Sequence, residues 1–300
     1  MSREFTNKQK LFFVSGKGGV GKSLTSAALA LDMARSGKKV LLVELGDARF
    51  FSRSFQLEDR GAEPTPWKDG VDVAAWEGEA CLREYILHYV KVAAIADLFF
   101  ENSVMKSLVR AAPALNELAI IGKATSGVRN FAAPMPYDAI VVDSYATGHF
   151  LALLKAARGM YEAVKFGPMG RHSSDIDQVL CDPEHTKYVI VTLPEELPVS
   201  ETLELQKSLN DDFKATPTVF VNKCQFLGAT ENLPSSAEVP EAAKGFVAEM
   251  DRIKNVETEA RQRLQKEAAA SVDGPFVFSV DPAEVAEGLH PATRGLWTTS

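Results

Sequence analysis

The sequence predicts an α/β fold, with a mostly parallel, doubly wound sheet that carries helices on both faces and has helical insertions. Seven short runs rich in β-branched and aromatic residues alternate with segments of helical periodicity along the 300 residues. Continuous apolar runs of this length are typical of strands buried on both faces, as in a parallel sheet. A glycine-rich turn separates the first run from the first helical segment, as in strand–turn–helix units. We therefore expect a single domain over residues 1–300.

The expected strands follow the apolar runs in order. They lie at residues 10–15, 39–45, 71–76, 137–144, 187–193, 217–223 and 275–280. The first helix begins near Ser23, and Gly37 is well placed to end it, because glycine adopts the left-handed conformation of a helix C-terminus without strain.

Two stretches are longer than ordinary crossovers and have apolar residues at helical spacing. We interpret residues 79–133 as a helical insertion and residues 241–269 as a second helical segment. Both either pack on the sheet domain or form a surface for a partner or an apolar client. The segment 234–240, PSSAEVP, resembles a linker.

Composition and charge exclude several classes of protein. Lys and Arg number 33 against 40 Asp and Glu, for a formal charge of -7, and no basic cluster is present, so nucleic acid is not an expected partner. No apolar run approaches the roughly 18–20 residues of a membrane span. The polar N-terminus has no signal-peptide pattern, and the three cysteines form no CxxC pair. We expect a cytoplasmic protein.

The most specific motif is GKGGVGKS at residues 16–23, which matches the phosphate-binding loop (P-loop) pattern G-x-x-x-x-G-K-[ST] between a strand and a helix. Glycines let backbone N–H groups converge on phosphate oxygens, and the helix N-terminus adds positive potential. We expect Lys22 to reach the β- and γ-phosphates and the Ser23 hydroxyl to ligate Mg²⁺. The predicted cofactors are ATP or ADP with Mg²⁺. The nucleotide-binding candidates are Gly16, Lys17, Gly18, Gly19, Val20, Gly21, Lys22, Ser23 and Leu24.

A second motif, YDAIVVDSYATGHFLALL at residues 137–154, ends a buried strand at Asp143 and turns into a new helix. A carboxylate at this place can hold an Mg²⁺-bound water, and the N–H of Gly148 can approach a γ-phosphate. The alternative is that Asp143 only caps the turn.

Lys17 gives the loop the deviant Walker A form, which resembles the superfamily of ParA, MinD, ArsA and nitrogenase-iron-protein ATPases. Within it, D-x-x-x-T-G-H-x-x-x-L-L resembles the switch II signature of the ArsA family, which includes arsenite-pump ATPases and the factor that delivers tail-anchored membrane proteins. The resemblance covers nearly the whole chain. It implies that Lys17 acts in trans across a nucleotide-sandwich dimer, and that Asp143, Thr147, Gly148 and His149 form switch II. It also matches Asn222 to a residue that reads the adenine edge.

The chain departs from the family at switch I. In an ungapped count, ELGDARFFSRSF at residues 44–55 places Gly46 and Arg53 where the family has its two acids. Loss of a carboxylate that orients the nucleophilic water lowers the hydrolysis rate by orders of magnitude. Asp47 or Glu44 could replace one if the loop shifts. Leu24 stands where the family commonly has a hydroxyl residue, which costs about 1 kcal/mol of binding.

Several functions remain open. The first is an ArsA-type ATPase that works as a dimeric conformational switch with slow hydrolysis. The second is a hydrolysis-deficient, nucleotide-gated interaction subunit. The third is a positioning ATPase similar to MinD or ParA, and the fourth is a small-molecule kinase, which leaves Lys17 unexplained. The expected partner is a second copy or a related ATPase, and a protein client or membrane-associated partner is a further class.

Overall fold

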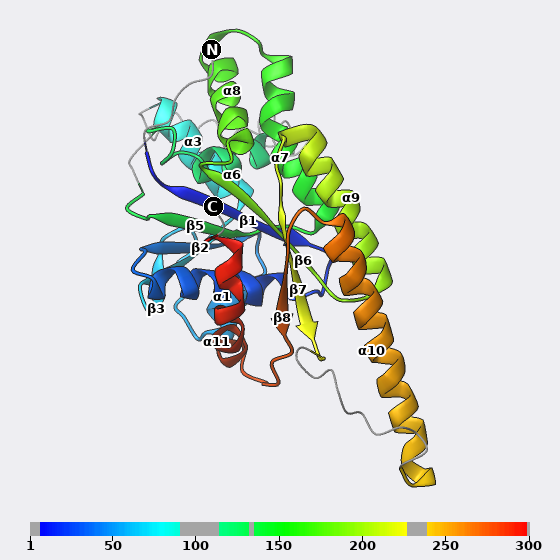
Figure 1. Cartoon of the computed structure of the whole chain (residues 1–300). Helices are drawn as coiled ribbons and strands as arrows, with labels where there is room; N and C mark the ends of the chain where they lie inside the picture. The colour runs from blue at the N-terminus through cyan, green and yellow to red at the C-terminus, as the bar shows by residue number, and fades with distance from the viewer. Residues whose placement is uncertain (1–6, 91–113, 132–134, 227–238, 299–300) are drawn as a thin grey trace.

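The computed structural model describes residues 7–90, 114–131, 135–226 and 239–298, which form an eight-stranded sheet with helices on both faces (Figure 1). The strands are β1 (Lys10–Gly16), β2 (Val40–Leu45), β3 (Thr65–Lys68), β4 (Val71–Trp76), β5 (Ala139–Asp143), β6 (Thr186–Thr192), β7 (Thr218–Cys224) and β8 (Ser271–Pro275). The helices are α1 (Lys22–Arg35), α2 (Phe50–Ser54), α3 (Gly78–Val90), α6 (Ala114–Ala124), α7 (Thr147–Ala163), α8 (Gly167–Cys181), α9 (Glu196–Phe213), α10 (Glu241–Glu267), α11 (Pro282–Thr293) and the short 3₁₀ helix η1 (Arg294–Leu296).

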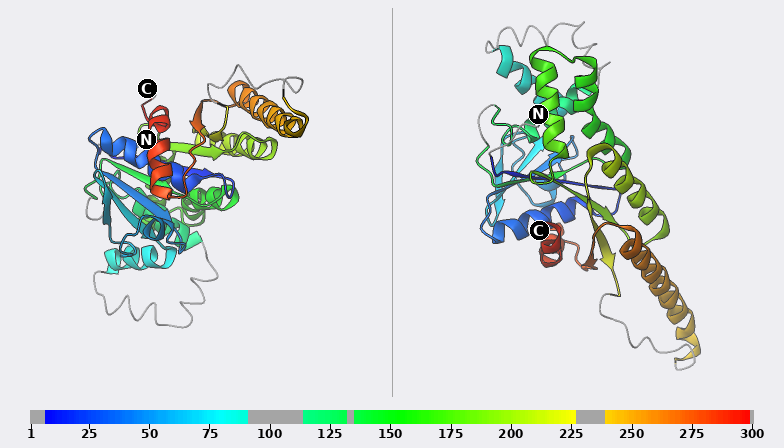
Figure 2. Two further views of the ribbon diagram at one scale, coloured as in Figure 1. Left: turned by 90° about the horizontal axis from the view of Figure 1, so that it is seen from below. Right: turned by 45° about the horizontal axis from the view of Figure 1, so that its top comes forward.

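The sheet order is β3-β4-β2-β5-β1-β6-β7-β8, and every pairing is parallel except the antiparallel one between β3 and β4. Alternate residues of β1 point into two separate apolar clusters, one on each face of the sheet. Helices α1 and α11 cover one face, whereas α3, α6, α7, α8 and α9 cover the other (Figures 1 and 2). The predicted doubly wound, mostly parallel α/β fold is confirmed.

Helix α1 ends as the sequence predicts. Gly37 has a φ of 85°, its N–H donates to the Ala34 carbonyl at 2.9 Å, and the Lys38 N–H donates to the Met33 carbonyl at 3.2 Å. This pair of bonds is the Schellman motif, which satisfies the last carbonyls of the helix.

The prediction for the last strand is wrong. The sheet is completed by residues 271–275 rather than 275–280, and Phe276, Phe278 and Val280 are exposed at 47%, 90% and 99%. Gly274 explains the choice, because a Cβ there would lie 2.3 Å from Cζ of Phe220 on the neighbouring strand. Only glycine lets the two strands pair while the Phe220 ring stays in the core.

The two long helical segments predicted from the sequence differ from each other in their position relative to the sheet. Helix α6 lies within the predicted insertion 79–133 and α3 begins one residue before it; residues 91–113 and 132–133 are outside the described part of the chain. Helix α10 occupies the segment expected at 241–269, and its N-terminal part extends away from the sheet (Figure 2). Phe246 on this helix is 70% exposed, while Val247 is buried. Most of the expected linker at 234–240 is outside the described residues.

Among the described residues, no helix combines the length and apolar character that a bilayer crossing requires.

Candidate functional site

The loop at residues 16–23 joins β1 to α1 at the carboxyl edge of the sheet, and two of its glycines are required by their neighbours. A Cβ at Gly16 would lie 2.1 Å from the Val191 carbonyl oxygen, and a Cβ at Gly21 would lie 2.3 Å from Nδ2 of Asn222. Gly18 and Gly19, in contrast, are exposed and have open space around them. The loop is therefore wedged against β6 and β7 at its base and open at its tip.

Asn222, near the end of β7, is hydrogen-bonded to the phosphate loop. Its amide Nδ2 donates to the Val20 carbonyl at 2.9 Å, and its Oδ1 accepts from the Lys223 N–H at 2.9 Å. The side chain is 4% exposed. Asn222 thus braces the phosphate loop in this structure.

Asp143 lies at the centre of the site. It pairs in register with Val14 of β1 and with Glu44 of β2, so three strand ends meet beside it. Its Oδ1 accepts from the Ser26 hydroxyl at 3.2 Å, and the Ser23 hydroxyl also bonds to this carboxyl group. The structure therefore brings Ser23 of the loop and Asp143 of the second motif together.

Burial dominates the electrostatics of this centre. Desolvation raises the pKa of Asp143 to about 6, although the Ser23 hydrogen bond and the Lys22 ammonium oppose the rise. Burial also lowers the pKa of Lys22, which Asp143 in turn opposes. Lys22 donates to the Lys17 carbonyl at 3.1 Å. A half-buried ammonium beside a buried carboxylate is a polar centre that gains from phosphate and cation ligands.

Lys17 has a partner within its own chain. Its Nζ lies 2.6 Å from Oε1 of Glu201 on α9, and each side chain is 38% exposed. Leu24, further along the loop, packs against the apolar cluster that α1 and α11 share.

Switch II begins where β5 ends and continues into α7. No side chain caps the N-terminus of α7, and Gly148 is exposed there with no atom within 4 Å of a Cβ position. The first N–H groups of a helix lack internal acceptors and favour anions. Thr147 and Gly148 therefore offer open backbone donors next to Asp143.

Switch II also contacts the helical insertion. The rings of Tyr145 and His149 stack with centroids 4.0 Å apart, and Nε2 of His149 lies 3.3 Å from Oε1 of Glu117 on α6. The Ser15 hydroxyl donates to the Tyr145 carbonyl at 2.9 Å, which ties the same turn to β1.

Switch I is held by contacts that sequence patterns did not reveal. The buried carboxylate of Glu44 accepts from the N–H groups of Phe50 at 2.8 Å and Phe51 at 3.2 Å, so it caps the short helix α2. Arg49 donates to the Gly46 carbonyl and pairs with Asp59 and Glu77. Glu44 is thus committed to the structure of the switch.

Gly46 and Arg53, the two positions that diverge from the family, interact with residues other than Asp143. Gly46 has a φ of 96° and donates its N–H to the Trp76 carbonyl, and a Cβ there would meet Tyr145 at an ordinary 3.7 Å. Arg53 is exposed on α2 and acts electrostatically on Asp59. Asp47, the other acid of residues 44–55, is exposed.

The residues present fit a magnesium–nucleotide complex. Hydroxyl and carboxylate oxygens are the ligands Mg²⁺ prefers, and Ser23 and Asp143 supply them beside the Lys22 ammonium. The open loop tip at Gly18 and Gly19 leaves room for backbone approach to phosphates.

Comparison with protein-family models matches residues 9–171 to the model of the anion-transporting ATPases, ArsA. The match covers the phosphate loop, both switches and more than half of the chain. The chain belongs to the ArsA family. It is therefore a member of a family of ATP-binding ATPases, and the predicted resemblance is confirmed.

Three individual relatives of this ArsA-family chain are also named as ATPases. ATPase BagA of Mycobacterium tuberculosis is 30% identical over 254 residues, which cover 81% of this chain and 71% of that protein. Putative arsenical pump-driving ATPase 2 of Aquifex aeolicus is 27% identical, covering 71% of this chain and 80% of its own. ATPase get3 of Pyrenophora tritici-repentis is 26% identical, covering 71% and 73%.

Proposed function

We propose that this ArsA-family chain binds Mg²⁺·ATP at residues 16–23 and works as a dimeric conformational switch that hydrolyses ATP slowly. Lys22 holds the β- and γ-phosphates, and Ser23 ligates Mg²⁺. Asp143 holds an Mg²⁺-bound water, for which its carboxyl group must be ionised. Thr147 and Gly148 offer N–H groups to the γ-phosphate. The uncapped start of α7 and the cluster of Ser23, Ser26 and Asp143 support these roles.

The adenine end of the nucleotide lies at Asn222 in this proposal. Its Nδ2 has a second hydrogen besides the one given to Val20, since a side-chain amide has two donor hydrogens. Asn222 can therefore brace the loop and contact the base at once.

The observation that carries slow turnover is the engagement of Glu44. One of the two acids in residues 44–55 caps α2 with both carboxylate oxygens, and the other, Asp47, is exposed. Gly46 and Arg53 supply no carboxylate, and an arginine stays protonated at neutral pH. Water at the γ-phosphate is then poorly oriented, and positioning supplies most phosphoryl-transfer catalysis.

Two contacts support a switch. In the dimer we propose, Lys17 reaches the partner's phosphates and must leave Glu201, so the ion pair at 2.6 Å belongs to the open state. A γ-phosphate at the start of α7 acts on His149, which contacts Glu117 of α6. Nucleotide can thereby bias the helical insertion, where a protein client or membrane-associated partner binds.

Phosphate release by the purified chain tests the proposal. Wild type is expected to release phosphate slowly, and Arg53→Asp is expected to release it at least tenfold faster. The charge-matched control is Arg252→Asp on α10, which should leave the rate unchanged. A fast wild type that is unaffected by Arg53→Asp contradicts the proposed defect in switch I.

A second candidate, the hydrolysis-deficient interaction subunit, is favoured by the same Glu44 contacts. It predicts ATP binding that Lys22→Ala abolishes, together with no measurable phosphate release from the chain alone. An absence of ATP binding in Mg²⁺ buffer excludes both candidates.

A further inference from the structure

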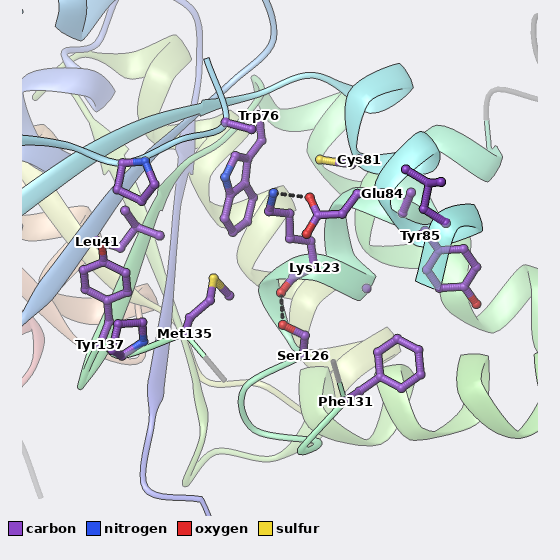
Figure 3. Close-up of a pocket in the computed structure, with 16 residues that line it drawn as sticks. Leu41, Trp76, Cys81, Glu84, Tyr85, Lys123, Ser126, Phe131, Met135 and Tyr137 are labelled. Carbon is purple, nitrogen blue, oxygen red and sulfur yellow. Dashed lines mark hydrogen bonds and ion pairs between the residues drawn. The ribbon is translucent and has the colours of Figure 1, made fainter. Parts of the chain in front are cut away.

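A cavity of about 590 Å³ lies between the β2–β4 side of the sheet and helices α3 and α6 (Figure 3), and no residue of the phosphate loop lines it. Leu41 and Tyr137 line it where β2 and β5 begin, and Trp76 lines it where β4 ends. Tyr85 and Phe131 close it on the side of the helices. The cavity therefore lies between the sheet and the described helices of the insertion.

The volume suits a small molecule and not a membrane-spanning helix. Sites for drug-sized ligands measure roughly 300–1,000 Å³. A transmembrane helix about 10 Å across and 30 Å long occupies on the order of 2,000 Å³. The cavity is thus a separate feature from any surface that would hold an apolar protein segment.

Most of the wall is apolar, but one buried donor has no acceptor among the residues that the structure describes. The Trp76 side chain is 1% exposed, and its Nε1 has no hydrogen-bond partner in that part of the chain. An unpaired buried N–H costs about 1–3 kcal/mol. A ligand that brings an acceptor oxygen removes this cost.

Lys123 adds a cation on the same wall. Its Nζ lies 5.2 Å from the centre of the Trp76 ring and pairs with Glu84 (Figure 3). The two partners differ in burial, because the Lys123 side chain is 15% exposed and the Glu84 side chain is 62% exposed. Water therefore screens the Glu84 carboxylate more than the Lys123 ammonium. An ammonium has three donors, so Lys123 can bind a second oxygen without losing Glu84.

We propose that this cavity binds an amphipathic monocarboxylate of the fatty-acid class. The acyl chain lies against Leu41, Met135 and Tyr137, and the carboxylate accepts from Lys123 beside Trp76. The apolar walls supply the affinity, since burial of apolar area contributes about 25 cal/mol per Å². The Lys123 ammonium, on a side chain that is 15% exposed, selects a carboxylate over a neutral head group.

Titration calorimetry with laurate and with lauryl alcohol tests this proposal on the full-length protein. Wild type is expected to bind one laurate. Lys123→Met keeps the apolar stem and should weaken laurate binding by about tenfold or more, the effect of losing a charged hydrogen bond. Its affinity for the alcohol should change by less than about threefold. Lys155→Met, at an exposed lysine of α7, is the matched control and should match wild type.

Glu84→Gln is a second variant, at an exposed side chain where misfolding is not expected. It releases Lys123 from its carboxylate and should tighten laurate binding while leaving the alcohol unaffected. No saturable binding of laurate to wild type overturns the proposal. Equal loss of laurate and alcohol in Lys123→Met, or laurate affinity that ignores both substitutions, also overturns it.

Discussion

At the scale of single residues, Asp143 makes the stability of the nucleotide-free protein depend on pH. Burial raises the pKa of this carboxyl group from 3.8 to about 6. The favourable contribution of the protonated form is complete below about pH 4 and is lost as the pH rises through about 6. Ionised Asp143 therefore destabilises the fold at neutral pH.

Asp143→Asn, which resembles the protonated form, should raise the free energy of unfolding by up to about 3 kcal/mol near pH 8. The gain should shrink to under about 1 kcal/mol near pH 4, as measured by urea denaturation without nucleotide or Mg²⁺. A gain of equal size at both pH values contradicts the assigned pKa.

Glu201 gives a prediction about the open state. Because its carboxylate holds Lys17, Glu201→Gln should free Lys17 and favour ATP-dependent dimers. Exposed pairs contribute about 0–1 kcal/mol, so the ATP concentration at half-dimerisation should fall by no more than about fivefold for each pair broken. Sedimentation measures this midpoint, and Glu204→Gln on the same helix is the control. A midpoint that stays constant or rises argues against competition for Lys17.

At the scale of elements, the short helix α2 depends on one carboxylate. Glu44→Ala leaves the N–H groups of Phe50 and Phe51 without their acceptor; the Phe51 bond is buried, and an unpaired buried donor costs about 1–3 kcal/mol. We expect a drop of about that size in the free energy of unfolding, measured by chemical denaturation. Glu44→Gln, which keeps one acceptor oxygen, should lose less. A Glu44→Ala protein as stable as wild type would mean that α2 is not held by this cap.

Elements were predictable where the signal is local. Six of the seven apolar runs were recognisable as strands because strands buried on both faces need apolar residues at successive positions. β3 escaped prediction, since TPWK is a short, half-exposed edge strand with a proline. The last strand was misplaced because PFVFSV is the more apolar segment, whereas the room beside Phe220 selects Gly274.

The candidate site, too, was predictable only where its residues belong to a local sequence motif. The phosphate loop and Asp143 belong to contiguous motifs, so the sequence located them. Their partners come from remote segments: Glu201 lies on α9 and Glu117 on α6. No local pattern marks an acidic residue on an amphipathic helix as the partner of a loop lysine. Glu44, considered as a substitute acid, was revealed as a helix cap only by its hydrogen bonds.

At the scale of the whole molecule, the phosphate loop, both switches and the helical insertion form one connected unit. β1 carries the loop, β5 carries switch II, and β2 carries switch I, and the three strands are neighbours in the sheet. Tyr145, His149 and Glu117 extend this unit to α6. In the function we propose, these contacts carry the effect of a bound phosphate from the carboxyl edge of the sheet to the insertion.

The nucleotide-dependent dimeric switch is tested most directly by sedimentation equilibrium. This experiment measures the mass of the protein with Mg²⁺·ATP and with Mg²⁺·ADP. We expect a dimer in ATP that persists because turnover is slow, a monomer in ADP, and a monomer in both for Lys17→Ala. Wild-type mass that is the same in ATP and ADP would contradict the nucleotide-dependent dimeric switch.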